Sequence, residues 1–167
     1  MPRQHCITRA SRIAGMACLA LLAVAPPAWA DLTAFLGLTP TPQTRMVRGL
    51  SGGLSLLIVG FEFEYANTSE DEADALPGLK TWSGNVLLQT PVEVSGVQVY
   101  GTGGVGLYRE ALVAASETST AVNLGGGAKI RLLGPLRLRL DYRVFRLQGS
   151  PRNQTYQRFY AGANLAF

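Results

Sequence analysis

The chain has 167 residues, with 15 basic and 11 acidic side chains and a net charge of +4. Its single histidine and both cysteines lie at or before position 18, so the rest of the chain holds neither residue type. This distribution excludes disulfides, zinc sites of His and Cys, and mechanisms based on either side chain from all later residues. The length predicts a single domain.

Residues 1–30 predict a secretory signal peptide. A basic N-terminal segment with three arginines precedes the apolar run 13–25, and AWA at 28–30 supplies an A-x-A cleavage site. A membrane anchor is the alternative, but the apolar run is shorter than the about 20 residues that a spanning helix needs. Cleavage after Ala30 leaves the domain 31–167 with 12 basic and 11 acidic residues. The high isoelectric point of the whole chain is therefore no indication of nucleic-acid binding.

Alternating polarity along the domain predicts eight β-strands. Longer polar loops (39–44, 67–78, 111–119 and 148–155) alternate with shorter turns (57–60, 91–96 and 134–135). An even strand number, about ten residues per strand and alternating loop lengths are typical of bacterial outer-membrane barrels. The predicted strands are 32–38, 45–56, 60–66, 79–90, 97–110, 120–133, 136–147 and 156–167.

The seventh predicted strand, LRLRLDYRVFRL at 136–147, places apolar and charged side chains on opposite faces. In a membrane barrel the apolar face meets lipid and the charged face lines the lumen. A soluble sandwich or lipocalin-like barrel is the alternative, but its polarity would be inverted in this strand. We therefore expect an all-β fold, an eight-stranded antiparallel up-and-down transmembrane β-barrel that follows a cleavable signal peptide.

The last strand ends in YAGANLAF and presents a continuous apolar face. The residues of this face are Phe159, Ala161, Ala163, Leu165 and Phe167. This end resembles the C-terminal signal of outer-membrane barrels, which the barrel-assembly machinery recognises. The domain resembles small barrels of the OmpA transmembrane-domain and OmpX type, which implies a Gram-negative outer membrane, with membrane lipid and the assembly machinery as partners. No peptidoglycan-binding domain follows, so cell-wall tethering is not implied.

Strand parity also predicts which side chains fill the lumen. Eight strands leave an interior only wide enough for side chains, and an unpaired charge there costs several kcal/mol. A closed ring needs no partner to satisfy its edges, so we expect a monomer. The predicted charged lumen residues are Glu62, Glu64, Lys129, Arg131, Arg137, Arg139, Asp141, Arg143 and Arg158. The uncharged ones are Tyr100, Tyr108, Asn123, Tyr156, Tyr160 and Asn164.

These charges are expected to form one network. Because strands three and seven lie on opposite walls, Glu62 and Glu64 should reach the arginines at 137 and 139. The cations at 129 and 131 lie one strand over. We predict that the Glu–Arg/Lys network plugs the lumen and gives the barrel a structural or surface-interaction role. A narrow porin-like channel for small ions or solutes, lined by the same groups, is the alternative.

Other motifs carry no chemistry that we expect to be used. GTGGVG at 101–106 matches G-x-G-x-x-G, but it continues a strand; with the glycines 125–127 it should relieve crowding where strands curve or where bulky lumen side chains such as Tyr108 pack. The acidic run 70–74 lacks the Gly turn and final Glu of an EF-hand, so a solvated loop is expected rather than a metal site.

Catalysis is not expected, and neither is a cofactor. The serines at 51, 55 and 83 have no histidine to activate them. Near the opposite outer loop, Arg146 and Arg152 either contact anionic lipid headgroups or only keep the loop soluble.

Overall fold

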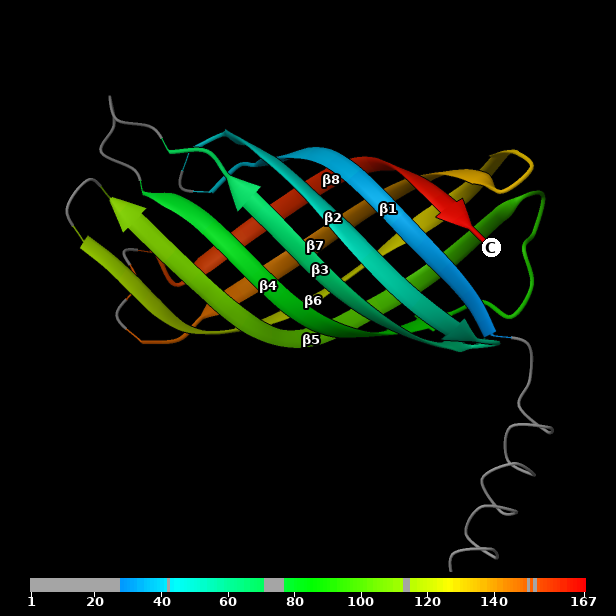
Figure 1. The fold of residues 1–167 in the computed structure, drawn as a ribbon, viewed down its shortest axis with the longest axis horizontal. Helices are drawn as coiled ribbons and strands as arrows, with labels where there is room; N and C mark the ends of the chain where they lie inside the picture. Colours follow the sequence, from blue (N-terminus) through cyan, green and yellow to red (C-terminus); the bar gives the residue numbers. More distant parts are fainter. Residues whose placement is uncertain (1–27, 42, 71–76, 113–114, 150, 152) are drawn as a thin grey trace, which may run out of the picture.

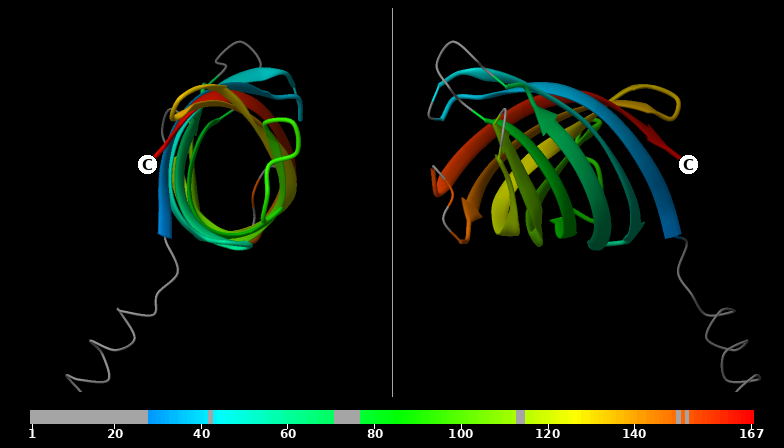
Figure 2. Two further views of the ribbon diagram at one scale, coloured as in Figure 1. Left: turned by 90° about the vertical axis from the view of Figure 1, so that its right-hand side faces the viewer. Right: turned by 60° about the vertical axis from the view of Figure 1, so that its left-hand side comes forward.

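The computed structural model describes residues 28–41, 43–70, 77–112, 115–149, 151 and 153–167. These residues form eight antiparallel strands, and β1 pairs with β8 so that the sheet closes into a barrel (Figures 1 and 2). The strands are β1 Ala28–Thr39, β2 Arg45–Leu56, β3 Val59–Thr68, β4 Gly78–Gln89, β5 Val97–Leu112, β6 Ala115–Leu133, β7 Leu136–Leu147 and β8 Thr155–Ala166. The predicted up-and-down barrel is confirmed in strand number, order and direction.

Strand boundaries agree with the sequence pattern to within two residues except at the start of β1 and at one hairpin. β1 begins at Ala28, four residues before the predicted strand and within the predicted signal peptide, and pairs with β2 from there. The limits of β2 and β7 are as predicted, whereas the predicted loop 111–119 is wrong. There β5 and β6 continue as paired strands as far as Leu112 and Ala115, and residues 113–114 lie outside the described part. Small and polar residues suggested a loop, but the segment has no Gly or Pro to interrupt the ladder, so the two strands continue instead.

The barrel has two unlike ends. At the loop end, on the left of Figure 1, lie the β1–β2, β3–β4, β5–β6 and β7–β8 connections. The terminal end holds the start of β1, the end of β8 and the three remaining turns (Figure 1). The predicted signal peptide falls almost wholly on residues 1–27, outside the described part. In what is described, no helix is long and apolar enough to cross a membrane.

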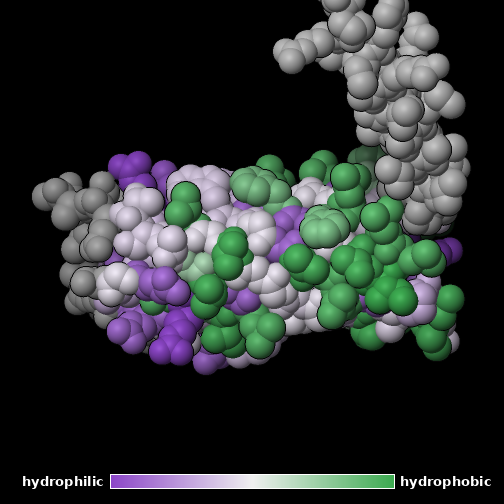
Figure 3. Space-filling model, turned by 90° about the horizontal axis from the view of Figure 1, so that it is seen from below, coloured by the Kyte–Doolittle hydropathy of each residue, from purple (hydrophilic) through white to green (hydrophobic). Residues whose placement is uncertain are grey.

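The polarity of the wall is inverted relative to a soluble protein. Large apolar side chains point outward and are exposed on every strand, among them Leu36, Phe63, Val105 and Phe159. On the face in Figure 3 they gather toward the terminal end, while hydrophilic residues lie toward the loop end. Polar side chains point inward because strand residues alternate between the two faces. The expected division into an outward apolar face and an inward polar face is therefore present in this barrel.

The interior is filled by side chains, and part of it is apolar. Beside the polar groups lie two apolar clusters that parity reasoning did not single out. One surrounds Phe35, whose ring stacks on Tyr160 with centroids 4.1 Å apart. The members of the two clusters are Leu79, Tyr108, Ala121, Phe145, Leu147 and Tyr156, and Phe35, Val47, Ala66 and Tyr160.

Candidate functional site: the charged network inside the barrel

The centre of the interior is an ion network between opposite walls. From β3, Glu62 reaches across the lumen to two arginines of β7: it pairs with Arg139, and its Oε1 lies 2.8 Å from Arg143 Nη2. The side chains of Arg139 and Arg143 are 0% exposed. Both guanidinium groups are therefore fully enclosed by other side chains at this level.

Glu64 extends the network toward β8. Its Oε1 accepts a hydrogen bond from Arg158 Nη1 at 2.8 Å, and its Oε2 accepts one from the Tyr160 hydroxyl at 3.3 Å. Arg143 Nη1 also lies 3.2 Å from Oε2, but this nitrogen makes no well-directed hydrogen bond, so charge alone holds that contact. Glu64 is thus shared between two strands of the opposite wall.

Asp141 completes the network on β7 itself. Its carboxylate accepts hydrogen bonds from Arg143 Nε at 2.9 Å, from Arg139 Nη2 at 3.1 Å and from the Tyr100 hydroxyl. The three carboxylates Glu62, Glu64 and Asp141 therefore face the three guanidinium groups of residues 139, 143 and 158. The network has no net charge, so it lacks the excess of one sign that selects ions in a pore.

Three predicted members of the network pair elsewhere. Lys129 Nζ lies 2.5 Å from Asp31 Oδ2, while Arg131 and Arg137 bind the two oxygens of Glu93 at 2.5 and 3.0 Å. The expectation that Arg137 pairs with Glu62 or Glu64 is wrong. Strands of a barrel are staggered as well as opposed, so β3 meets a later part of β7 than simple opposition suggests.

The displaced cations line an open chamber at the terminal end. Its volume is about 720 Å³, and it contains both the Lys129–Asp31 pair and the arginine pairs of Glu93. Glu93 belongs to the turn between β4 and β5, which parity reasoning could not place because it is not in a strand. By alternation along β1, Asp31 points into the lumen. Its contact with Lys129 depends on how the strands are aligned around the barrel, which the pattern of a single strand does not show.

Neutral polar side chains also hold the carboxylates. Ser51 Oγ donates to Glu62 Oε2 at 3.1 Å, and Asn85 Nδ2 lies 3.5 Å from Oε1. Ser51 thus has a carboxylate neighbour, although the sequence offers it no histidine. That carboxylate is paired with two buried guanidinium groups, which stabilise its charged form and leave it a poor base.

The glycine-rich segment 101–106 lies in β5, facing the glycines of β6 across the sheet. The crowded residue is Tyr100 and not the predicted Tyr108. A Cβ at Gly127 would lie 2.5 Å from the Tyr100 hydroxyl, so the glycine makes room for the ring that binds Asp141. Tyr108 instead donates from its hydroxyl to the Gln148 carbonyl at 2.6 Å.

The remaining predicted sites lie apart from the network. The apolar face of the last strand points outward, and Phe167 is 73% exposed. Arg146 is exposed on the outer face of β7, whereas Arg152 and most of the acidic run 70–74 lie outside the described residues. Among the described residues, no group of three or more His, Cys, Asp or Glu side chains is placed to hold a metal ion.

No protein-family model matches the sequence, and no curated protein matches it. Solved structures with a similar fold include neisserial surface protein A (NspA), at a TM-score of 0.68 and 14% identity over 84% of this chain and 97% of that one. The N-terminal barrel domain of Pseudomonas aeruginosa OprF has a TM-score of 0.66 and 14% identity, over 83% of this chain and 97% of that one. The outer-membrane enzyme PagL has a TM-score of 0.53 and 10% identity, over 81% of this chain and 98% of that one. The chain thus has the fold of small outer-membrane barrels, as the sequence resemblance implied.

Proposed function

We propose that the protein is a non-enzymatic outer-membrane β-barrel with a structural or surface-interaction role, and that the charge network closes its lumen. The outward apolar surface and the fold shared with NspA and the OprF domain support this location. In this proposal the precursor is exported, cleaved after Ala30 and inserted as a monomer by the barrel-assembly machinery. The apolar face ending in Phe167 serves as the insertion signal.

The complete burial of Arg139 and Arg143 carries the proposal of a closed lumen. Removing one member of a buried ion pair costs about 3–5 kcal/mol, because the partner stays behind as an uncompensated charge. Transient opening of this neutral, fully paired network is therefore costly. The chamber at the terminal end favours a second candidate, a narrow channel, because it brings water as far as the Lys129–Asp31 pair.

A non-enzymatic role is proposed although the fold also occurs in an outer-membrane enzyme. Residues 31–167 contain neither His nor Cys, so a nucleophile would depend on a carboxylate base. The pair that the structure offers, Ser51 with Glu62, is buried within the network and bound to arginine. A lipid substrate would have no path to it from the outer surface.

Two measurements test the proposal. The folded barrel should migrate differently on SDS gels before and after boiling, and the wild type should show no steady conductance in a planar bilayer. The double variant Glu62→Gln/Glu64→Gln leaves an excess of positive charge and should lower the melting temperature and raise ion leakage. Glu93→Gln, which changes a pair at the terminal end, serves as the control.

Each outcome discriminates between the candidates. Steady, reproducible openings of the wild type would favour the narrow channel over the plug. A double variant equal to the wild type in both melting temperature and leakage would show that the network does not close the lumen. The same mobility before and after boiling, with the protein soluble in the periplasm, would contradict the membrane barrel itself.

A further inference from the structure

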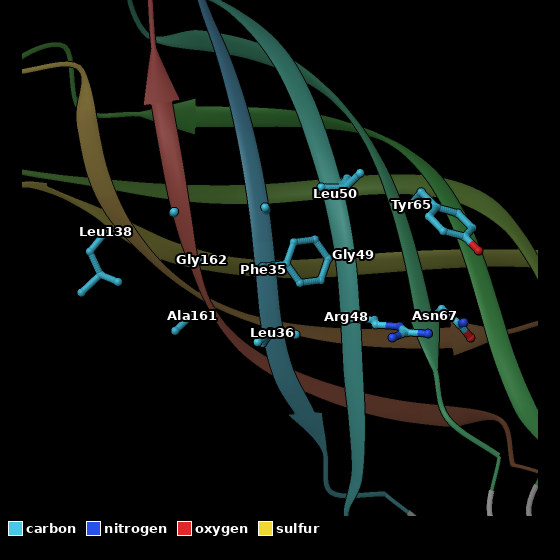
Figure 4. A pocket seen from close by; sticks show the side chains of 12 residues that line it. Phe35, Leu36, Arg48, Gly49, Leu50, Tyr65, Asn67, Leu138, Ala161 and Gly162 are labelled. Atoms are coloured by element: carbon cyan, nitrogen blue, oxygen red, sulfur yellow. The ribbon is translucent and has the colours of Figure 1, made fainter.

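The outer surface of the barrel has an apolar groove where β1, β2 and β8 meet (Figure 4). Its volume is about 710 Å³. Small outward residues such as Ala34, Ala161 and Ala163 form its floor, and Leu36 and Leu50 stand along it. It is a shallow groove between exposed large apolar side chains.

The groove has a structural origin on the inner side of the wall. The Phe35 ring points inward between Gly49 and Gly162, its register partners on the neighbouring strands (Figure 4). A Cβ at Gly49 would lie 2.3 Å from the Phe35 ring, and one at Gly162 2.9 Å from Phe35 Cβ. The wall is therefore held thin at this point, with glycine inside and alanine outside.

A polar row lies at one end of the groove. Arg48 of β2, Asn67 of β3 and Lys80 of β4 are successive register partners across the sheet. With strands about 4.8 Å apart, the two cations stand roughly 10 Å from each other with the amide between them. Figure 4 shows the Arg48 and Asn67 side chains next to each other beside the groove. Within the described part of the protein, neither Arg48 nor Lys80 has a hydrogen bond or ion pair.

Arg48 stands among apolar neighbours on the outer face. Leu36 is its partner on β1, and Met46 and Leu50 flank it along β2, all three exposed. A charge on the lipid face of a barrel costs about 2–4 kcal/mol at the midplane and about 0–1 kcal/mol near the interface. The next outward row holds the aromatic pair Tyr65–Trp82, of the kind that marks the membrane interface.

We propose that the polar row and the groove together bind one membrane lipid with a phosphate-bearing headgroup of net negative charge. The phosphate accepts hydrogen bonds from the Arg48 guanidinium, the Asn67 amide and the Lys80 ammonium, while an acyl chain lies along the groove over Ala34. Arginine and lysine are the preferred phosphate donors, and the lipid neutralises two cations for which the described residues supply no counter-ion. The inference rests on the proposed membrane location and adds a specific lipid to it.

The test uses the mature barrel folded in zwitterionic detergent micelles. It is titrated with phosphatidylglycerol and, separately, with phosphatidylcholine of the same acyl chains, and bound lipid is counted by native mass spectrometry. The wild type should retain one phosphatidylglycerol in preference to phosphatidylcholine. Arg48→Gln and Lys80→Gln should each weaken phosphatidylglycerol binding about tenfold, because each removes a charge-assisted contact. Ala34→Leu should weaken the binding of both lipids by filling the groove.

The control is Arg146→Gln, which removes an exposed outward arginine of β7, away from the groove. It should bind both lipids as the wild type does. Equal retention of the two lipids by the wild type, unchanged binding in Arg48→Gln and Lys80→Gln, or an equal loss in Arg146→Gln would each overturn the site. Boiled and unboiled samples are compared on SDS gels for every variant. A wild type without a mobility shift contradicts the membrane barrel and the site with it, whereas a shift without lipid preference contradicts the site alone.

Discussion

At the residue scale, Arg143 connects more of the charge network than any one of its carboxylates does. It contacts Glu62, Glu64 and Asp141, and its Nη2 lies 3.1 Å from the Tyr160 hydroxyl. Without it, three buried carboxylates would share the two remaining guanidinium groups in a space that water does not enter. The free energy of this region therefore depends on charge balance more than on any single contact.

The variant Arg143→Met tests that dependence, because methionine keeps much of the side chain's bulk without its charge. The free energy of unfolding should fall by about 3–5 kcal/mol. Arg131→Met is the control: its side chain is 56% exposed, so losing its contact with Glu93 should cost less than about 1 kcal/mol. Urea unfolding in lipid vesicles, followed by the fluorescence of Trp82, measures both. Similar losses in the two variants would contradict a central role for Arg143.

Parity along single strands was sufficient to predict which side chains face the lumen. The inward positions of Glu62, Arg139 and Arg158 follow from alternation alone. Their partners do not, because pairing across the lumen depends on strand stagger, which no single strand encodes. That is why Arg137 was expected near Glu62 but pairs with Glu93. Partners in turns, such as Glu93, have no periodic signal that could have indicated them.

At the element scale, the tight turns at the terminal end set how neighbouring strands are joined. The turn between β6 and β7 contains Gly134, whose φ is +54°, in the left-handed region that residues with a Cβ avoid. Nothing lies within 4 Å of where its Cβ would be. Any cost of a side chain here therefore comes from the backbone conformation and not from a clash.

Gly134→Ala should accordingly lower the free energy of unfolding by about 1 kcal/mol, since the left-handed region costs about 1–2 kcal/mol for an L-residue. Gly84→Ala is the matched control, because Gly84 lies within β4 and also has open space where its Cβ would be. There alanine should be neutral or stabilising by up to about 1 kcal/mol. Urea midpoints of both variants measure the difference. A loss at residue 84 as large as at residue 134 would show that the turn conformation is not the cause.

The sequence pattern predicted most elements because breakers and alternation coincide. Prolines bound β1, and Gly134-Pro135 separates β6 from β7. The predicted loop at 111–119 is wrong, because small and polar residues there belong to a hairpin that continues the β5–β6 ladder. A run of apolar residues followed by a run of polar ones shows no alternation, so this segment could not be distinguished from a loop by its pattern.

At the scale of the whole molecule, closure depends on the seam between the first and last strands. Asp31 to Leu38 of β1 pair with Phe159 to Ala166 of β8. All of these pairs lie after the expected cleavage site, so removal of residues 1–30 would leave the paired seam intact. Beyond it, the backbones of Ala30 and Phe167 exchange two hydrogen bonds of 2.8 and 2.9 Å. Cleavage after Ala30 would remove these two hydrogen bonds, so in the mature chain Phe167 lies just beyond the paired seam, and its ring points outward.

That geometry separates two roles of Phe167 that a single substitution can test. Phe167→Ser leaves the β1–β8 pairs unchanged and removes a ring that is 73% exposed, so the purified variant should refold into lipid vesicles with the mobility shift and urea midpoint of the wild type. If the assembly machinery recognises the ring, the amount of the variant in the outer membrane of cells should nevertheless fall several-fold. Leu133→Ser, another exposed apolar residue at the terminal end, is the control and should leave that amount unchanged. A variant that reaches the membrane normally would contradict the signal, and one that fails to refold in vesicles would show that the ring stabilises the barrel itself.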